Sequence, residues 1–228
     1  MISLGGYTVV VTGFPRTGTS MLMRILKFSG ISIIADSDLH LPQHKHDPYG
    51  CLEMKDVGTW LASNSKKITR NKAIKIVTPY AEWYPIDRKF KAIFMQRDLN
   101  EIVTSLLAMR TVWQEDIGES VSWARGYLRY HNIPTLFIQY RDAIKYPRTT
   151  VLQIKDFLGA NIDVDKAVKA IDADARNRYK KDPTILGHDR PDHIIRTDFE
   201  AYQDLNVQHY GTPGFVPPEE SGDENART

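Results

Sequence analysis

An anion-binding loop near the amino terminus carries the residues best suited to chemistry. Gly13 and Gly18 are separated by four residues and followed by a hydroxyl, in the order Gly13-Phe14-Pro15-Arg16-Thr17-Gly18-Thr19-Ser20. Backbone N–H groups at a helix start bind anions, and glycines let the chain approach a phosphate without a clash at Cβ. The spacing is that of a nucleotide-binding P-loop. Thr19 stands where an ATP- or GTP-using enzyme has its phosphate-bridging lysine, and the basic residue is instead Arg16.

The segments on either side of this loop predict a strand followed by a helix. Residues 7–12 are rich in β-branched side chains, as is typical of a strand buried on both faces of a parallel sheet. Apolar side chains then recur at helical spacing from Met21 to Leu26, and Gly30 ends the predicted helix. An ordinary β-turn-helix with a glycine-rich bend would have the same local pattern.

A second pair of residues, Arg97 and Ser105, is spaced to bind another phosphate. A buried strand is predicted over residues 92–96, and a helix that carries Ser105 begins just after Arg97. Arginine offers a planar fork of donors and serine a single donor, so the two can converge on one phosphate at the carboxyl edge of a sheet. The alternative is a surface arginine at a strand end and a serine that faces solvent.

Taken together, the two segments resemble the sulfotransferase family, which uses the sulfuryl donor 3′-phosphoadenosine 5′-phosphosulfate (PAPS). In that family a Pro-Lys/Arg-Ser/Thr-Gly-Thr-Thr/Ser loop binds the 5′-phosphosulfate, and an Arg followed eight positions later by a Ser binds the 3′-phosphate. The resemblance implies that the donor is bound by Pro15, Arg16, Thr17, Gly18, Thr19, Ser20, Arg97 and Ser105.

The resemblance runs from about residue 7 to about residue 160. Residues 136–142 resemble the family's strand that ends in Tyr-Glu-Asp, which implies that Tyr140 lies near the adenine. Residues 47–53 are similar to the Asn-Pro-x-Gly-Tyr-Tyr-Glu segment of a bacterial branch. The family's C-terminal Arg-Lys-Gly clamp has no clear equivalent, and Arg178 could reach the 3′-phosphate in its place.

The chain departs from the family at several positions around the reaction. Met21 replaces the tryptophan that stacks on adenine in cytosolic relatives, and Arg141 replaces the glutamate of Tyr-Glu-Asp. Val77 stands at the catalytic histidine of the family's Lys-Thr-His-Leu-Pro strand end. Valine cannot move a proton, so the general base must be another residue.

Three residues are predicted to serve the transfer step: Arg16, Glu53 and Lys75. Arg16 and the loop amides would stabilise the charge that develops on the leaving 5′-phosphate. The family has a lysine at the position of Lys75, which implies contact with donor and acceptor oxygens. Glu53 is the predicted base, since some bacterial relatives keep a glutamate base in this segment. The alternatives are a solvated strand-end lysine and a carboxylate in the first turn of a helix, stabilised by the helix dipole.

One of three upstream histidines is the second choice for the base: His40, His44 and His46. Their loose spacing does not indicate a zinc site, and sulfuryl transfer requires no metal. Four aromatic residues could line an acceptor pocket or belong to the core: Trp60, Tyr80, Trp83 and Tyr84.

The composition predicts one domain of ordinary size. The 228 residues contain 30 Lys and Arg against 28 Asp and Glu, so the charge does not indicate a nucleic-acid-binding surface. The single cysteine excludes an internal disulfide, and no apolar run approaches the ~20 residues of a membrane helix. No signal peptide is apparent, which predicts a cytoplasmic protein.

Strand-like and helical segments alternate along the chain, which predicts an α/β fold of three layers: a mostly parallel central sheet flanked by helices. The resemblance implies the P-loop NTPase-like fold of sulfotransferases. Strands are expected at 7–14, 31–34, 73–78, 91–96 and 134–140, and helices near 19–29, 52–66, 98–111, 117–130 and 148–158, with one more after residue 160. We expect a single domain over 1–210 and a disordered tail over 211–228.

The expected function is transfer of a sulfuryl group from PAPS to an acceptor hydroxyl or amine, which leaves adenosine 3′,5′-bisphosphate (PAP). The sequence does not indicate whether the acceptor is a small molecule, glycan, lipid or protein. A P-loop kinase of a small metabolite would share the sheet and the first loop, but it would have lysine in place of Thr19 and no use for Arg97 with Ser105. A catalytically silent protein that binds PAP or PAPS would keep the phosphate contacts and lack a base.

Overall fold

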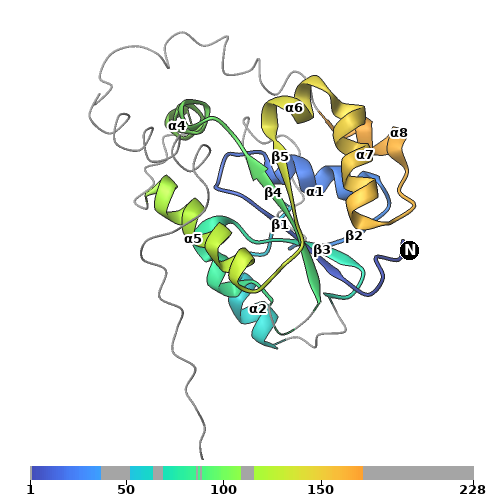
Figure 1. Cartoon of the computed structure of the whole chain (residues 1–228), viewed down its shortest axis with the longest axis horizontal. Helices are drawn as coiled ribbons and strands as arrows, with labels where there is room; N and C mark the ends of the chain where they lie inside the picture. The colour runs from blue at the N-terminus through green and yellow to red at the C-terminus, as the bar shows by residue number, and fades with distance from the viewer. Residues whose placement is uncertain are drawn as a thin grey trace, which may run out of the picture.

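The computed structural model describes residues 2–36, 52–63, 69–85, 87, 89–108 and 116–171. Five parallel strands form one sheet in the order β2-β3-β1-β4-β5 (Figure 1). The strands are β1 (Thr8–Thr12), β2 (Ser32–Ile34), β3 (Lys72–Lys75), β4 (Phe90–Gln96) and β5 (Thr135–Gln139). The helices are α1 (Thr19–Phe28), α2 (Val57–Ser63), the 3-10 helix η2 (Thr78–Trp83), α4 (Leu99–Ala108), α5 (Ile117–Tyr130), α6 (Tyr140–Lys145), α7 (Pro147–Leu158) and α8 (Val164–Lys169).

Strand β1 lies at the centre of the sheet, and every one of its residues is buried. Val10 is paired in register with Ile74 of β3 on one side and with Ala92 of β4 on the other. A strand that is covered on both faces has no need of polar residues at alternate positions, which explains its β-branched run. Because β3 and β4 both run parallel to β1, their carboxyl ends flank the loop that follows β1.

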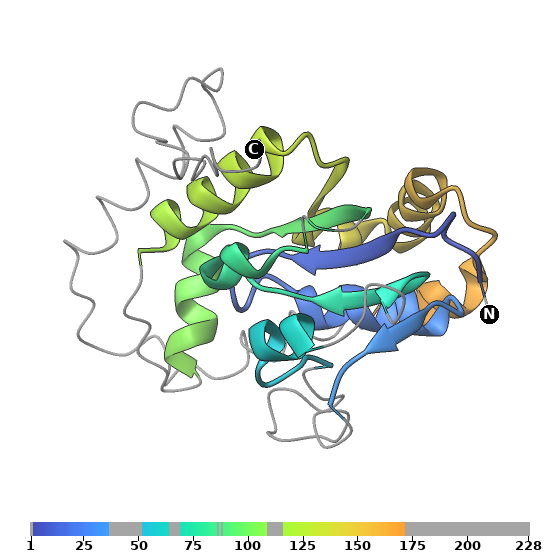
Figure 2. The same cartoon turned by 90° about the horizontal axis from the view of Figure 1, so that it is seen from below.

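Helices cover both faces of the sheet (Figures 1 and 2). Val9 and Val11 belong to a core shared with α1, α7 and α8, whereas Val10 belongs to a core shared with α2, α4, α5 and η2. Alternate side chains of β1 thus point to opposite faces of the sheet and belong to two separate apolar cores. The predicted α/β fold with a parallel sheet flanked by helices is confirmed.

The predicted elements agree with the structure apart from local differences. The sequence did not predict η2 or α6 as separate short helices. Helix α2 begins at Val57, later than the expected start at residue 52, and Leu52 has the left-handed φ of 52°. Glu53 therefore precedes the helix, so its alternative role as a carboxylate of the first helical turn is wrong. The whole of the predicted tail, 211–228, and the end of the predicted domain lie outside the described residues.

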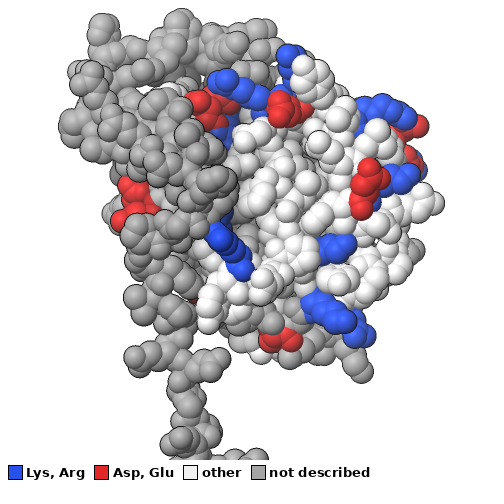
Figure 3. All heavy atoms as spheres, viewed as in Figure 1, with Lys and Arg blue, Asp and Glu red and all other residues white. Residues whose placement is uncertain are grey.

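The surface of the described residues carries mixed charge. On the face that Figure 3 shows, basic and acidic side chains are interspersed and surround a broad uncharged area. Among the described helices, none has both the length and the apolar character needed to cross a membrane.

Candidate functional site

The anion-binding loop joins the carboxyl end of β1 to the start of α1, and its backbone requires glycine at both ends. Gly13 has a φ of 139°, and a Cβ there would lie 2.5 Å from the carbonyl oxygen of Met95. Gly18 has a φ of 107°, and its Cβ would lie 2.7 Å from the ring of Tyr140. Arg16 adopts the left-handed region with a φ of 72°, a strained conformation that is concentrated at functional sites.

A hydrogen bond inside the loop holds its shape. The Thr17 hydroxyl donates to the carbonyl oxygen of Phe14 at 2.7 Å, and the Thr17 amide donates to the same oxygen at 3.1 Å. Thr17 is only 2% exposed. The sequence predicts that the Thr17 hydroxyl binds the donor, but in the structure this hydroxyl donates its hydrogen bond to the loop backbone. Thr19 and Ser20, together with Pro15 and Arg16, line a neighbouring cavity.

The two predicted phosphate-binding segments are in direct contact. Nε of Arg16 donates to the hydroxyl of Ser105 at 3.0 Å, and Nη1 of Arg97 donates to the backbone carbonyl of Arg16 at 2.8 Å. Arg97 and Ser105 are both buried. The structure therefore brings together three side chains from β1–α1 and β4–α4 that the sequence assigned to one donor.

Glu101 forms an ion pair with the Arg97 guanidinium. Its carboxylate accepts from Nε of Arg97 at 3.0 Å and from Nε of Arg141 at 3.1 Å. Burial opposes ionisation of Glu101, but the hydrogen bonds and positive charges of the two arginines outweigh it, so the pKa of Glu101 lies below its usual value. Sequence reasoning missed Glu101, although the i,i+4 spacing from Arg97 is typical of a helical ion pair.

Tyr140 packs against Arg97. The guanidinium of Arg97 lies over its ring at 4.2 Å from the centroid, within the range of a cation–π contact. The ring also touches Gly18 and is only 5% exposed. Tyr140 thus supports the loop and Arg97 in this structure, and its contact with adenine stays a prediction.

Lys75, at the end of β3, connects the loop to Glu53. Its ammonium lies 2.8 Å from Oε2 of Glu53 and donates to the Ser20 hydroxyl at 3.2 Å. The Lys75 side chain is 4% exposed and that of Glu53 is 37% exposed. The alternative of a solvated strand-end lysine is therefore wrong. The Lys75 ammonium, from the strand next to β1, thus lies beside the hydroxyl of Ser20, the residue after Thr19.

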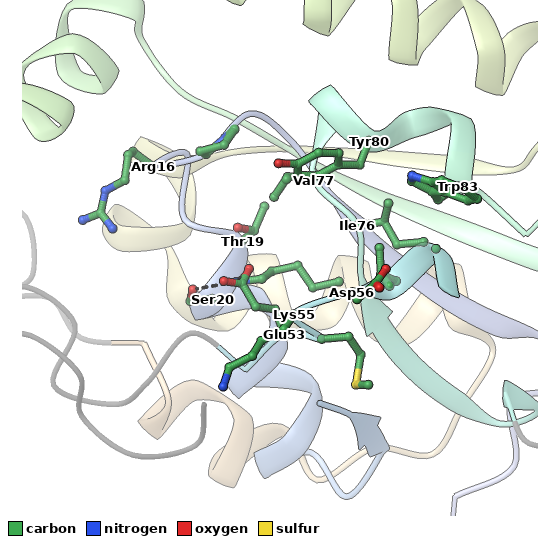
Figure 4. Close-up of a pocket in the computed structure, with 15 residues that line it drawn as sticks. Arg16, Thr19, Ser20, Glu53, Lys55, Asp56, Ile76, Val77, Tyr80 and Trp83 are labelled. Carbon is green, nitrogen blue, oxygen red and sulfur yellow. Dashed lines mark hydrogen bonds and ion pairs between the residues drawn. The ribbon is translucent and has the colours of Figure 1, made fainter. Parts of the chain in front are cut away.

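A cavity of about 520 Å³ opens beside these residues. Figure 4 shows Thr19 and Ser20 on one side of it, Glu53 and Lys55 on another, and Tyr80 and Trp83 across from them. It is lined by Pro15, Arg16, Thr19, Ser20, Glu53, Met54, Lys55, Asp56, Val57, Gly58, Lys75, Ile76, Val77, Tyr80 and Trp83. The three predicted catalytic residues thus share one cavity.

The four candidate aromatic residues divide between this cavity and the core. Tyr80 and Trp83 line the cavity and are each nearly half exposed. Tyr84 is buried, and its hydroxyl is 2.6 Å from that of Thr12; burial raises the pKa of Tyr84 well above its usual range. Trp60 is half-buried and packs against the core.

Some predicted residues lie outside the described part of the chain, namely Arg178, His40, His44 and His46. Where the structure describes the chain, no group of three His, Cys, Asp or Glu side chains is arranged to hold a metal ion.

Comparison with known proteins gives structural similarity only. No family model and no curated protein matches the sequence. The chain is similar to the sulfotransferase domain of the Synechococcus PCC 7002 olefin synthase, with a TM-score of 0.48 and 14% identity, over 90% of this chain and 95% of that one. It is also similar to retinol dehydratase in a complex with retinol and PAP, with a TM-score of 0.47 and 15% identity, over 90% of this chain and 83% of that one. A third similar structure is the sulfotransferase STF1 from Mycobacterium tuberculosis H37Rv, with a TM-score of 0.44 and 16% identity, over 86% of this chain and 76% of that one.

Two of these three proteins are described as sulfotransferases. The scores and identities are low, so the chemistry of the site has to follow from its own residues.

Proposed function

We propose that this protein is a sulfotransferase that moves a sulfuryl group from PAPS to an acceptor hydroxyl or amine. The observation that carries the proposal is the contact of the loop with the second phosphate-binding segment, through Arg16, Ser105 and Arg97. PAPS has anionic groups on both the 5′ and the 3′ positions of one nucleoside, so it needs two anion subsites that lie close together. A nucleotide phosphorylated only at the 5′ position has no partner for the second subsite.

The loop supplies the first subsite. The start of α1 directs backbone N–H groups toward an anion, and Thr19 and Ser20 add hydroxyls next to the cavity. The second subsite would use the forked guanidinium of Arg97 and the hydroxyl of Ser105. Glu101 and Tyr140 hold that guanidinium in place before the donor arrives.

The transfer step would take place where the loop meets the cavity. The acceptor oxygen or nitrogen forms a bond to sulfur while the bond between sulfur and the 5′-phosphate oxygen breaks. The acceptor proton passes to the carboxylate of Glu53, and the negative charge that builds up on the 5′-phosphate is stabilised by Lys75 and the loop amides. Lys75 would be able to contact the donor at the loop and the acceptor at Glu53, because its ammonium contacts both Ser20 and Glu53.

The test is a calorimetric titration with PAP and with AMP. We expect PAP to bind much more tightly, because only PAP has a group for Arg97 and Ser105. Arg97→Ala should weaken PAP binding by about 1.5 to 3 kcal/mol, roughly ten- to a hundredfold, and should weaken AMP binding less, because AMP loses only the support that Arg97 gives to the backbone of Arg16.

Arg148→Ala is the matched control, since it removes an exposed arginine whose ion pair with Asp165 lies on α7 and α8. Equal affinity of the unmodified protein for PAP and AMP would contradict the proposal. Tighter binding of ATP with magnesium would favour the kinase alternative, and PAP binding without transfer to any acceptor would favour the silent one.

A further inference from the structure

Arg141 follows the strand next to β4, at the same edge of the sheet as Arg97. Gln96 of β4 is paired in register with Gln139 of β5, and the two strands are parallel. Arg97 is the residue after Gln96, and Arg141 comes shortly after Gln139, in the first turn of α6. Ligands of open parallel sheets bind at the carboxyl ends of the strands. Both arginines therefore leave the sheet at the edge where the proposed donor site lies.

One carboxylate holds the two arginines next to each other. Oε2 of Glu101 accepts from Nε of Arg97 at 3.0 Å, and Oε1 accepts from Nε of Arg141 at 3.1 Å. Since the two oxygens of a carboxylate lie side by side, the two guanidiniums are neighbours. Tyr140, the residue before Arg141, packs against the Arg97 guanidinium as well. Ser105 lies one helical turn after Glu101 on α4, so its hydroxyl belongs to the same face of that helix.

The Arg141 guanidinium can still bind an anion. In the described part of the chain, its Nη atoms make no hydrogen bond or ion pair, and its side chain is 57% exposed. One carboxylate carries a single negative charge, so Glu101 alone does not neutralise both guanidiniums that it binds. The carboxylate of Asp98 accepts from the amide of Glu101 at 3.3 Å, and Asp142 is exposed. An ion pair with so exposed a partner adds little stability, but it orients the guanidinium before a ligand arrives, which lowers the cost of binding.

We infer that Arg141 is a second arginine of the subsite for the donor's 3′-phosphate and that Glu101 positions it there beside Arg97. The inference rests on the proposed function, because it takes PAPS as the donor. A phosphate monoester is doubly charged and has several acceptor oxygens, so it can accept from the forked guanidiniums of both arginines and from the hydroxyl of Ser105. Arg141 thereby increases the selectivity for a nucleotide that carries a phosphate on the 3′ position. It is a binding residue and takes no part in the transfer step.

The experiment compares the affinities of PAP, AMP and 3′-AMP by calorimetric titration. PAP has both phosphates, AMP has the 5′-phosphate alone, and 3′-AMP has the 3′-phosphate alone. Arg141→Ala should weaken PAP and 3′-AMP binding about tenfold, because a charge-assisted hydrogen bond to the 3′-phosphate is lost, and should weaken AMP binding less. Arg141→Lys should recover only part of the loss, since lysine keeps the charge and lacks the fork.

A double variant separates a direct contact from an indirect effect. If Arg141 acted only by supporting Glu101 and Arg97, Arg141→Ala would have no further effect on PAP binding once Arg97 is already alanine. We expect a further loss of at least about threefold in that background. Arg148→Ala is again the matched control, because Arg148 is similarly exposed and pairs with a carboxylate of another helix, so all nucleotides should bind as they do to the unmodified protein. Thermal melts of the same samples show whether each variant is folded.

The outcomes separate this inference from the proposed function. If PAP binds more tightly than AMP and Arg141→Ala leaves this difference unchanged, the role of Arg141 is overturned while the proposed donor stands. An effect of Arg141→Ala that disappears in the Arg97→Ala background would likewise overturn the direct contact. Equal binding of PAP and AMP to the unmodified protein would overturn the donor and, with it, the subsite. PAP binding that depends on Arg141 in a protein that transfers no sulfuryl group would support the inference and overturn the proposed activity.

Discussion

Glu53 and Lys75 form an ion pair and both line the cavity, yet the proposed mechanism gives them different tasks. Glu53→Gln should lower the rate of sulfuryl transfer by about 10² to 10⁴, the usual contribution of a positioned general base. PAP affinity should stay nearly unchanged, because Glu53 lies outside the loop and the Arg97 subsite. Initial rates with PAPS and a calorimetric titration with PAP measure the two effects separately.

Asp56→Asn is the matched control for this prediction. Asp56 lines the same cavity, and its Oδ1 accepts from the amide of Thr59 at 3.2 Å, a bond that asparagine can keep. Its rate should be unaffected. If Glu53→Gln lowers thermal stability and leaves the rate of the folded protein intact, Glu53 is only a partner of Lys75, and the three histidines, His40, His44 and His46, should be substituted next.

Glu101 makes the stability of the donor site depend on pH. Its pKa is lower in the folded protein than its usual 4.5, so its contribution to stability is present above that pH and is lost as the pH falls through the folded pKa. Glu101→Gln should therefore melt at a lower temperature than the unmodified protein near neutral pH, and the difference should shrink below pH 4.5. Thermal melts of both proteins across this range give the measurement.

Asp165→Asn serves as the control, because it removes an ion pair whose two side chains are 66% and 78% exposed. Exposed pairs contribute little to stability, so its melting temperature should stay close to that of the unmodified protein at each pH. A constant difference between Glu101→Gln and the unmodified protein at every pH would contradict the assigned role of the Glu101 charge.

At the scale of elements, the turn from β1 into α1 depends on the absence of a side chain at Gly13. Gly13→Ala would place Cβ 2.5 Å from the backbone oxygen of Met95 in β4, so the loop has to move away from the neighbouring strand. We expect the free energy of unfolding to fall by about 1 to 3 kcal/mol more than in a glycine variant without such a clash. PAP binding should be lost as well, because the loop amides change direction. Chemical denaturation and calorimetry test both effects.

Gly159→Ala is the appropriate comparison. Gly159 ends α7 with a φ of 62°, and no atom lies within 4 Å of its ideal Cβ, so alanine there meets only the cost of the left-handed backbone. Its PAP affinity should be normal. Equal losses of stability in the two variants would show that the contact with β4 does not constrain the loop.

At the scale of the whole molecule, donor binding should not depend on a metal ion. Thr19 replaces the lysine of a P-loop NTPase. The positive charges proposed to bind the donor are side chains at the carboxyl ends of three strands: Arg16 after β1, Lys75 on β3 and Arg97 after β4. PAP affinity and any transfer rate should therefore persist in excess chelator. Loss of PAP binding on chelation that zinc restores would instead indicate a metal site, with His40, His44 and His46 as the first residues to substitute.

The sequence by itself determined the strands, the main helices and the anion-binding loop. These features depend on local properties: β-branched runs such as that of β1, apolar residues at helical spacing in α1, and glycines at Gly13 and Gly18. The spacing between Arg97, just after β4, and Ser105, on α4, is local too. The start of α2 was not predicted correctly: Leu52, where the helix was expected to begin, has a left-handed φ of 52°, and the helix begins at Val57.

Only the tertiary structure decided which side chains meet. Ser105 with Arg16, Lys75 with Ser20 and Glu53, and Trp83 with Gly58 all join segments that are distant in the sequence. Their contacts follow from the strand order β2-β3-β1-β4-β5, which places the ends of β3 and β4 on either side of the loop. Strand order is set by the packing of whole elements against a common core, and the period of side chains within one segment does not encode it.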